Sequence, residues 1–118
     1  MNATQAGKLI GLMALYDNRK ADDPADVVAW LKVVGDLAYR DAEAAVVGHY
    51  RESRERIMPA DIRQRVAAIR AARLEAAGPV RIPEKLADRP LEAREWLQQT
   101  RRAIADGQEP PRAIGSGQ

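Results

Sequence analysis

The feature that most constrains this chain is a pair of helical apolar stripes in residues 39–73, separated by a polar joint at residues 51–57. After the joint, Ile62, Val66 and Ile69 repeat the spacing of one helical face. Before the joint, apolar and aromatic residues recur at i, i+3, i+4, i+7 and i+8: Ala42, Ala45, Val46, His49 and Tyr50. Because each stripe must be covered, we expect two helices that pack against each other.

The second of these helices is expected to start near Pro59. Pro59 suits a first helical turn, because its fixed φ is already helical and its missing N–H has no helical partner there. Asp61 adds a carboxylate where the helix dipole favours negative charge. Nothing in this central stretch resembles a reaction centre, so we expect it to provide a surface on a rigid support.

Three further segments show the helical period, at about residues 4–17, 24–38 and 91–105. The second opens with the carboxylates Asp22 and Asp23 before a proline, which indicates a helix cap, and its stripe continues to Ala38. Trp30 lies within that stripe, which favours a core position over a stacking platform. Gly35 lies off the stripe and weakens the helix.

These patterns predict an all-α fold with a small four-helix bundle in residues 1–77. Prolines at positions 79, 83 and 90 indicate a semi-rigid linker over residues 78–90. Asp88 and Pro90 then open an amphipathic helix within residues 91–106. Residues 107–118, with two prolines and several glycines, are expected to form a disordered tail.

The composition favours a soluble, cytoplasmic protein. Hydrophobic residues make up 46% of the 118-residue chain, but phenylalanine is absent, so the core is expected to be small and aliphatic. The absence of cysteine excludes disulfides and thiolate metal sites and fits a reducing compartment. The longest apolar run, residues 9–16, is far shorter than the roughly 20 residues of a membrane helix. We therefore expect no membrane partner.

The basic residues are concentrated in the central stretch. The net charge is +2, but residues 51–77 alone hold seven basic and four acidic residues. Arg54, Arg56, Arg63 and Arg70 are therefore candidate contacts for a nucleic acid or another partner, although a solvated surface is the simpler interpretation. The joint is longer than a helix-turn-helix turn and lacks glycine, which argues against that DNA-reading motif.

The residue types that perform catalysis or bind cofactors do not form a recognisable site in this sequence. The carboxylates of Asp22, Asp23 and Asp26 lack the spacing of a calcium loop, and helix capping explains them. The single histidine, His49, lies on an apolar helical face without partner ligands and is expected to be structural. No phosphate-binding glycine motif occurs. We predict that the protein is not an enzyme and holds no cofactor or metal.

The layout resembles the small phage replicative-helicase loader/inhibitor family and related short reading frames of actinobacteria and their phages. The resemblance covers about residues 3–77, and residues 101–107 resemble the end of the actinobacterial versions. It depends on helix-stripe residues and one helix start: Ala6-x-x-Leu9-Ile10, Ala29-Trp30, Asp36-Leu37, Asp41-Ala42-x-x-Ala45-Val46-Val47-x-His49-Tyr50 and Met58-Pro59-Ala60-Asp61-Ile62-Arg63.

The resemblance implies a non-enzymatic replication adaptor. Members of that family combine an N-terminal helical domain with a flexible C-terminal region. They bind a DnaB-type replicative helicase and a replication-initiator protein, and hold the helicase inactive until it reaches the origin. This chain departs from the pattern by having a clear amphipathic helix at residues 91–105.

That C-terminal helix is the predicted protein-binding element. Trp96 and Leu97 would be its anchors, supported by Ile104, because aromatic side chains buried at interface centres carry most of the binding energy. Arg94, Arg101 and Arg102 would form its polar rim. The alternative function is a small DNA-binding regulator that uses the arginines of residues 51–73, and a phage structural or assembly protein is a third class left open. Whether the helix packs on the bundle or on a partner also stays open.

Overall fold

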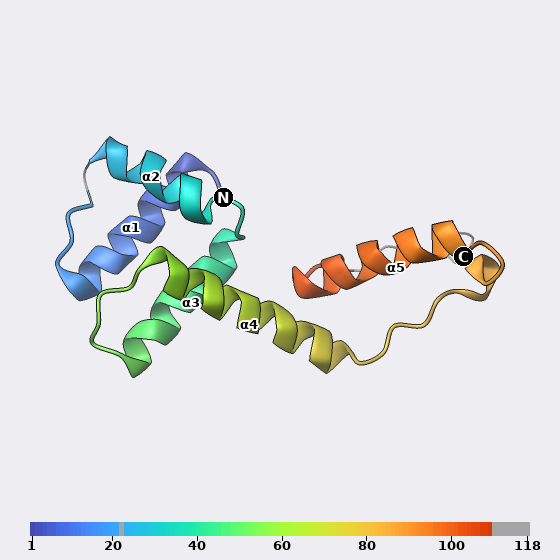
Figure 1. Cartoon of the computed structure of the whole chain (residues 1–118). Coiled ribbons are helices and arrows are strands. Elements are labelled where there is room, and N and C mark those ends of the chain that lie inside the picture. Colours follow the sequence, from blue (N-terminus) through green and yellow to red (C-terminus); the bar gives the residue numbers. More distant parts are fainter. Residues whose placement is uncertain (22, 110–118) are drawn as a thin grey trace. The chain divides into compact units, whose positions relative to one another are not determined.

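The computed structural model describes residues 1–21 and 23–109, and in this part of the chain every regular element is a helix, with no strand (Figure 1). The predicted all-α fold class is therefore confirmed. The elements in chain order are α1 (Ala3–Asp17), α2 (Pro24–Val34), α3 (Tyr39–Glu52), α4 (Pro59–Ala77), the 3₁₀ turn η1 (Glu84–Leu86) and α5 (Pro90–Ala105).

The chain divides into two compact units, residues 1–68 and residues from 69 onward. The boundary falls within α4, earlier than the limit at residue 77 that the sequence suggested. The first unit therefore contains α1, α2, α3 and the first half of α4. The second contains the rest of α4, η1 and α5, and each unit has buried residues of its own.

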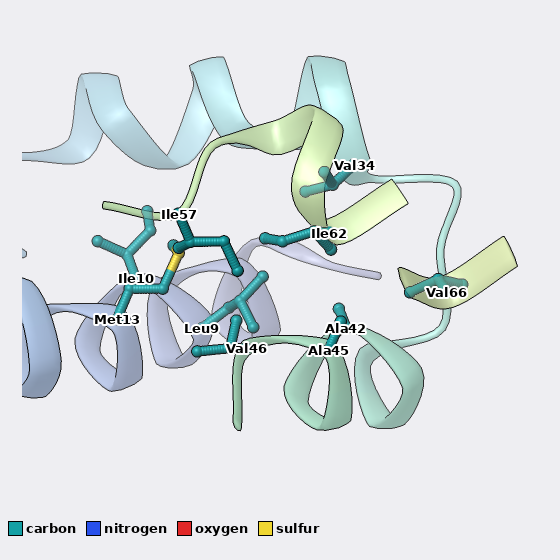
Figure 2. Packing of buried hydrophobic residues seen from close by; sticks show 10 residues of the cluster. All are labelled: Leu9, Ile10, Met13, Val34, Ala42, Ala45, Val46, Ile57, Ile62 and Val66. Carbon is teal, nitrogen blue, oxygen red and sulfur yellow. The ribbon is translucent and has the colours of Figure 1, made fainter. Parts of the chain in front are cut away.

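The first unit is built on α1, which packs against both α2 and α3. Its core is aliphatic, as the composition predicted, and the side chains converge from all four helical segments and the joint (Figure 2). Ile57 was assigned to a polar joint but is fully buried. The buried cluster consists of Leu9, Ile10, Met13, Val34, Ala42, Ala45, Val46, Ile57, Ile62 and Val66.

The helix starts follow from local hydrogen bonds. Asn2 and Gln5 form a capping box on α1, in which each side chain accepts from the other residue's backbone N–H. The Asp23 carboxylate accepts from the N–H of Ala25 at 2.9 Å, as the cap prediction required. The Asp61 carboxylate accepts from the N–H of Met58 at 2.8 Å and so closes the joint onto α4.

Helix α2 is shorter than its stripe predicted, ending at Val34 rather than at Ala38. The backbone turns at Gly35, where a Cβ atom would collide with the carbonyl oxygen of Leu31, and α3 then begins at Tyr39. Residues 35–38 thus form the connection between two helices. The interpretation of Trp30 as core needs correction too, because this side chain is only partly buried against the core.

In the second unit α5 packs against η1, which lies inside the predicted linker. Leu86 of this turn is 2% exposed, so residues 78–90 hold a core residue and are not simply an extended spacer. Helix α5 buries Ala93, Thr100 and Ala105. It starts with Pro90 as predicted, but its cap position is occupied by Arg89 rather than Asp88, without a capping side chain.

The C-terminal end of α5 is fixed to the second half of α4. The Arg73 guanidinium donates to the carbonyl oxygen of Ala105 at 2.8 Å, and Arg70 forms an ion pair with Asp106. The helix therefore folds back within its own unit. Of the predicted tail, residues 107–109 follow α5 with Gly107 at φ 72°, and residues 110–118 lie outside the described residues.

Candidate functional site

The predicted protein-binding anchors lie on the inward side of α5. Trp96, Leu97 and Ile104 are each partly buried in the second unit, next to the buried Thr100. The structure therefore places the predicted anchors on one helical face, but that face is already covered in part by the chain itself.

Two polar atoms on this face are buried without a partner. The Trp96 Nε1–H and the Thr100 hydroxyl lie one helical turn apart, and neither has a hydrogen-bond partner in the described part of the chain. A buried donor or acceptor that is left unpaired costs about 1–3 kcal/mol. The internal packing of α5 is thus less favourable than its clean apolar stripe suggested.

The predicted polar rim lies on the outer side of α5. Arg94, Arg101 and Arg102 are exposed to solvent, as is the first apolar residue after the helix start, Leu91. Anchors and rim therefore belong to two sides of one amphipathic helix, as the sequence predicted. A partner that took the inner face would have to displace α5 from its contacts within the unit.

The arginines proposed as nucleic-acid contacts differ in their environment. Arg63 donates to both carboxylate oxygens of Asp36, at 2.7 and 3.0 Å. Arg70 is paired with Asp106. The hydrogen bond from Arg63 lowers the pKa of Asp36, as expected for a charge-assisted pair. Two of the four candidates are therefore neutralised by carboxylates of the same chain, while Arg54 and Arg56 are exposed without such a pair among the described residues.

A buried polar network joins the end of α1 to the joint between α3 and α4. The Arg19 guanidinium donates to the Asp17 carboxylate through Nε at 2.8 Å and Nη2 at 2.6 Å, and also to the carbonyl oxygen of Ile57 at 2.8 Å. The Tyr50 hydroxyl donates to Asp17 and accepts from the N–H of Ile57. Four groups from two distant parts of the first unit's sequence are thereby held together.

The network determines the protonation of its members. Burial by itself raises the pKa of Asp17, but hydrogen bonds from Arg19 and Tyr50 outweigh that effect, and the pKa of this carboxyl is lowered. Burial and the bond to Asp17 raise the pKa of Tyr50. Asp17 is therefore a buried carboxylate held in its charged form.

An open groove lies beside this network, and we call it the Trp30 groove. Its volume is about 750 Å³. Arg19 covers one face of the Trp30 ring, with its guanidinium carbon 5.5 Å from the ring centroid. The groove is lined by Ile10, Asn18, Arg19, Lys20, Asp26, Ala29, Trp30, Val33, Arg56, Met58 and Pro59.

Sequence reasoning missed both the groove and the network. In the sequence, Asp17 ends the helical period of residues 4–17, and Asn18 and Arg19 mark only its loss. The signal that could have identified the site is the presence of a carboxylate and a guanidinium two residues apart where a helix ends, since such a pair can close the chain reversal. Its long-range partner Tyr50 could not be found from spacing.

His49 occupies the structural role that was predicted for it. It is buried, its Nε2 lies 2.7 Å from the carbonyl oxygen of Glu55, and its ring contacts the edge of Tyr50. Among residues 1–21 and 23–109, no group of three or more histidine and carboxylate side chains is placed to hold a metal ion. No helix in that part of the chain has the length and hydropathy needed to cross a membrane.

Comparison with protein-family models, with curated proteins and with solved structures finds no match to this chain. Function is therefore argued from the surfaces of the two units and from the sequence pattern. The three candidate surfaces are the inner face of α5, the arginines around the joint and the Trp30 groove.

Proposed function

We propose that this chain is a non-enzymatic adaptor of DNA replication that acts in the cytoplasm. In this proposal the inner face of α5, centred on Trp96 and Leu97, binds a DnaB-type replicative helicase and thereby loads or inhibits it. A replication-initiator protein is the proposed second partner. The identity of these partners rests on the sequence resemblance described above.

The observation that carries the proposal is the incomplete packing of α5. Its inner face is apolar and partly buried, yet Trp96 Nε1 and Thr100 Oγ1 remain without hydrogen-bond partners in the described chain. A partner groove that offered an acceptor to Trp96 would remove this penalty and bury more apolar surface. A partner of this kind would compensate for internal contacts that α5 loses on binding.

The contacts that hold α5 in its unit are suited to such an exchange. Its C-terminal end is held mainly by the Arg70–Asp106 ion pair and the hydrogen bond from Arg73 to Ala105. Both arginines and Asp106 are only partly buried. Polar contacts of this kind exchange readily with water, so they add little to the apolar packing that release of α5 has to break.

The DNA-binding alternative is less well supported. Arg63 and Arg70, two of its four candidate contacts, already bind carboxylates of the same chain. A phosphate would have to compete with Asp36 and Asp106 for these guanidinium groups. A DNA binder that made several phosphate contacts would also lose affinity steeply between low and moderate salt, which provides a direct test.

The proposal is tested by measuring binding to the purified replicative helicase of the organism that encodes the chain. Trp96→Ala combined with Leu97→Ala should reduce affinity by about 100-fold or more, because it removes both anchors. Leu91→Ala is the matched control, since Leu91 lies on the same helix but is 79% exposed and outside the inner face. Equal binding by both variants would refute a role for this face.

A second variant separates binding by α5 from a purely structural role. Leu86→Ala leaves α5 unchanged but weakens the packing of η1 against it. If the helicase competes with this internal contact, Leu86→Ala should increase affinity several-fold, because the binding-competent state becomes more populated. Reduced affinity in this variant would show that the partner recognises the folded second unit instead.

A further inference from the structure

We infer that the Trp30 groove of the first unit is a docking site for a short acidic peptide that carries a bulky apolar side chain. This site lies in a different unit from α5 and does not depend on the function proposed for that helix. Three features of the groove favour such a ligand: its apolar floor, the way Trp30 is held and the charges at its rim.

The floor of the groove is apolar although it is open to solvent. Val33 of α2 is 43% exposed and Met58, just before α4, is 56% exposed, and both line the same groove with Ile10, Ala29 and Pro59. Apolar side chains gathered in a concave surface mark an interaction site more often than scattered ones do. A volume of about 750 Å³ is enough for one or two large side chains of a peptide.

Trp30 is a fixed wall of this groove. Arg19 covers one face of its ring, and Arg19 is held in turn by the Asp17 carboxylate and the carbonyl oxygen of Ile57. Because Trp30 also packs against the core, its indole is held in one orientation before any ligand arrives. Such preorganisation reduces the entropy lost on binding.

The same network determines which charges can act on a ligand. Arg19 is already neutralised by Asp17 and its side chain is 5% exposed, so it contributes shape rather than charge. Lys20 and Arg56 are exposed at the rim and have no ion pair within the described residues. Asp26 contributes one opposing carboxylate. The two exposed cations therefore favour a ligand with carboxylates beside its apolar side chain.

The same features argue against other occupants. A single-stranded nucleic acid needs open aromatic faces and several cations along its backbone, whereas one face of Trp30 is covered and Arg19 is already paired. The chain's own residues 110–118 hold one arginine and no acidic side chain, so their side chains lack the complementary charge. An acidic peptide of another protein that carries a bulky apolar side chain matches both the apolar floor of the groove and the two exposed cations at its rim.

The test uses the full-length chain and a fluorescein-labelled peptide of about ten residues, in which two adjacent leucines are flanked by aspartates. Fluorescence polarisation should show saturable binding that weakens as salt is raised. Three comparison probes are used at the same concentrations. In one, serines replace the leucines; in another, lysines replace the aspartates; the third is a labelled oligothymidylate. Each should bind at least about tenfold more weakly than the acidic leucine peptide.

Matched variants locate the binding to the groove. Arg56→Glu should weaken peptide binding by about tenfold, whereas Arg54→Glu, in the same joint but outside the groove, should leave it unchanged. Val33→Ser should weaken binding by about tenfold, whereas Val28→Ser on the same helix should not. All four positions are exposed, and circular dichroism melting verifies that the variants remain folded.

Three outcomes would overturn the inference. The first is the absence of peptide binding at millimolar concentration. The second is equal loss in the groove variants and their controls, which would show non-specific attraction. The third is tighter binding of the oligothymidylate than of the peptide, which would assign the groove to nucleic acid. None of these results bears on the helicase measurements, because those variants lie in α5 and η1.

Discussion

The two units of this chain show what the same helical periodicity produces with and without a complete set of partners. In the first unit, stripes from four helical segments meet in one aliphatic core, and the polar groups of Asp17, Arg19 and Tyr50 bind one another. In the second, α5 has an equally regular stripe, but Trp96 Nε1 and Thr100 Oγ1 have no hydrogen-bond partner among the described residues. A regular stripe therefore predicts a helix, but not that its face is satisfied within the chain.

The largest effect is expected from breaking the buried network of the first unit. Asp17→Ala removes the carboxylate that holds Arg19 and leaves a buried guanidinium without its counter-charge. Loss of one partner from a buried pair destabilises a protein by about 3–5 kcal/mol. Urea denaturation should show this loss in the transition of the first unit. A loss below about 1 kcal/mol would mean that the network is no stronger than a surface pair.

Acidification should reveal the same network by a different route. The pKa of Asp17 is lowered in the folded state, so the carboxylate contributes stability that is complete above its ordinary pKa of about 4 and disappears as the pH falls through the lower folded value. Asp36 acts in the same direction. Unfolding free energies measured between about pH 5 and pH 2 should therefore fall less steeply for Asp17→Asn than for the parent chain. Equal slopes would contradict the assigned role of Asp17.

A smaller effect of opposite sign is expected in the second unit. Thr100→Val replaces a buried hydroxyl, which has no hydrogen-bond partner in residues 1–21 and 23–109, by a methyl group of similar shape. Because the desolvation penalty of the hydroxyl is removed, this unit should become more stable by about 1 kcal/mol. Hydrogen exchange of the α5 amides provides the measurement. Faster exchange would show that the hydroxyl has a hydrogen-bond partner in solution.

If α5 exchanges its internal contacts for contacts with a helicase, the Thr100→Val variant should also bind the helicase more weakly. The substitution stabilises the closed arrangement of the second unit and so reduces the population that is competent to bind. This links the stability of the unit to the proposed function.

Much of the fold could be predicted from sequence because helix formation is local. The stripes gave the helices, and Pro59, Asp23 and Pro90 marked starts that the structure retains. The end of α2 was predicted four residues too late, because the apolar stripe continues to Ala38, whereas the helix ends at Val34.

The candidate sites were less predictable because they depend on contacts between distant residues. The sequence indicated that Trp96 and Leu97 share a helical face, but it could not show that this face is partly covered and imperfectly satisfied. The Trp30 groove depends on Arg19 reaching the carbonyl of Ile57, 38 residues away in the chain. Neither periodicity nor composition carries that information.

The smallest effect on stability is expected at the surface of the first unit, from the ion pair between Arg63 and Asp36. This pair has the same chemistry as the pair between Arg19 and Asp17, but it is not buried. Both Arg63 and Asp36 are exposed, so water and salt screen their attraction, and holding two long side chains in one geometry offsets much of the gain. Arg63→Gln should therefore leave the urea midpoint unchanged within error, at low and at moderate salt. A clear shift would mean that the hydrogen bond from Arg63 to the carbonyl oxygen of Val33 helps to fix the end of α2. The end of α2 would then depend on a surface arginine as well as on Gly35.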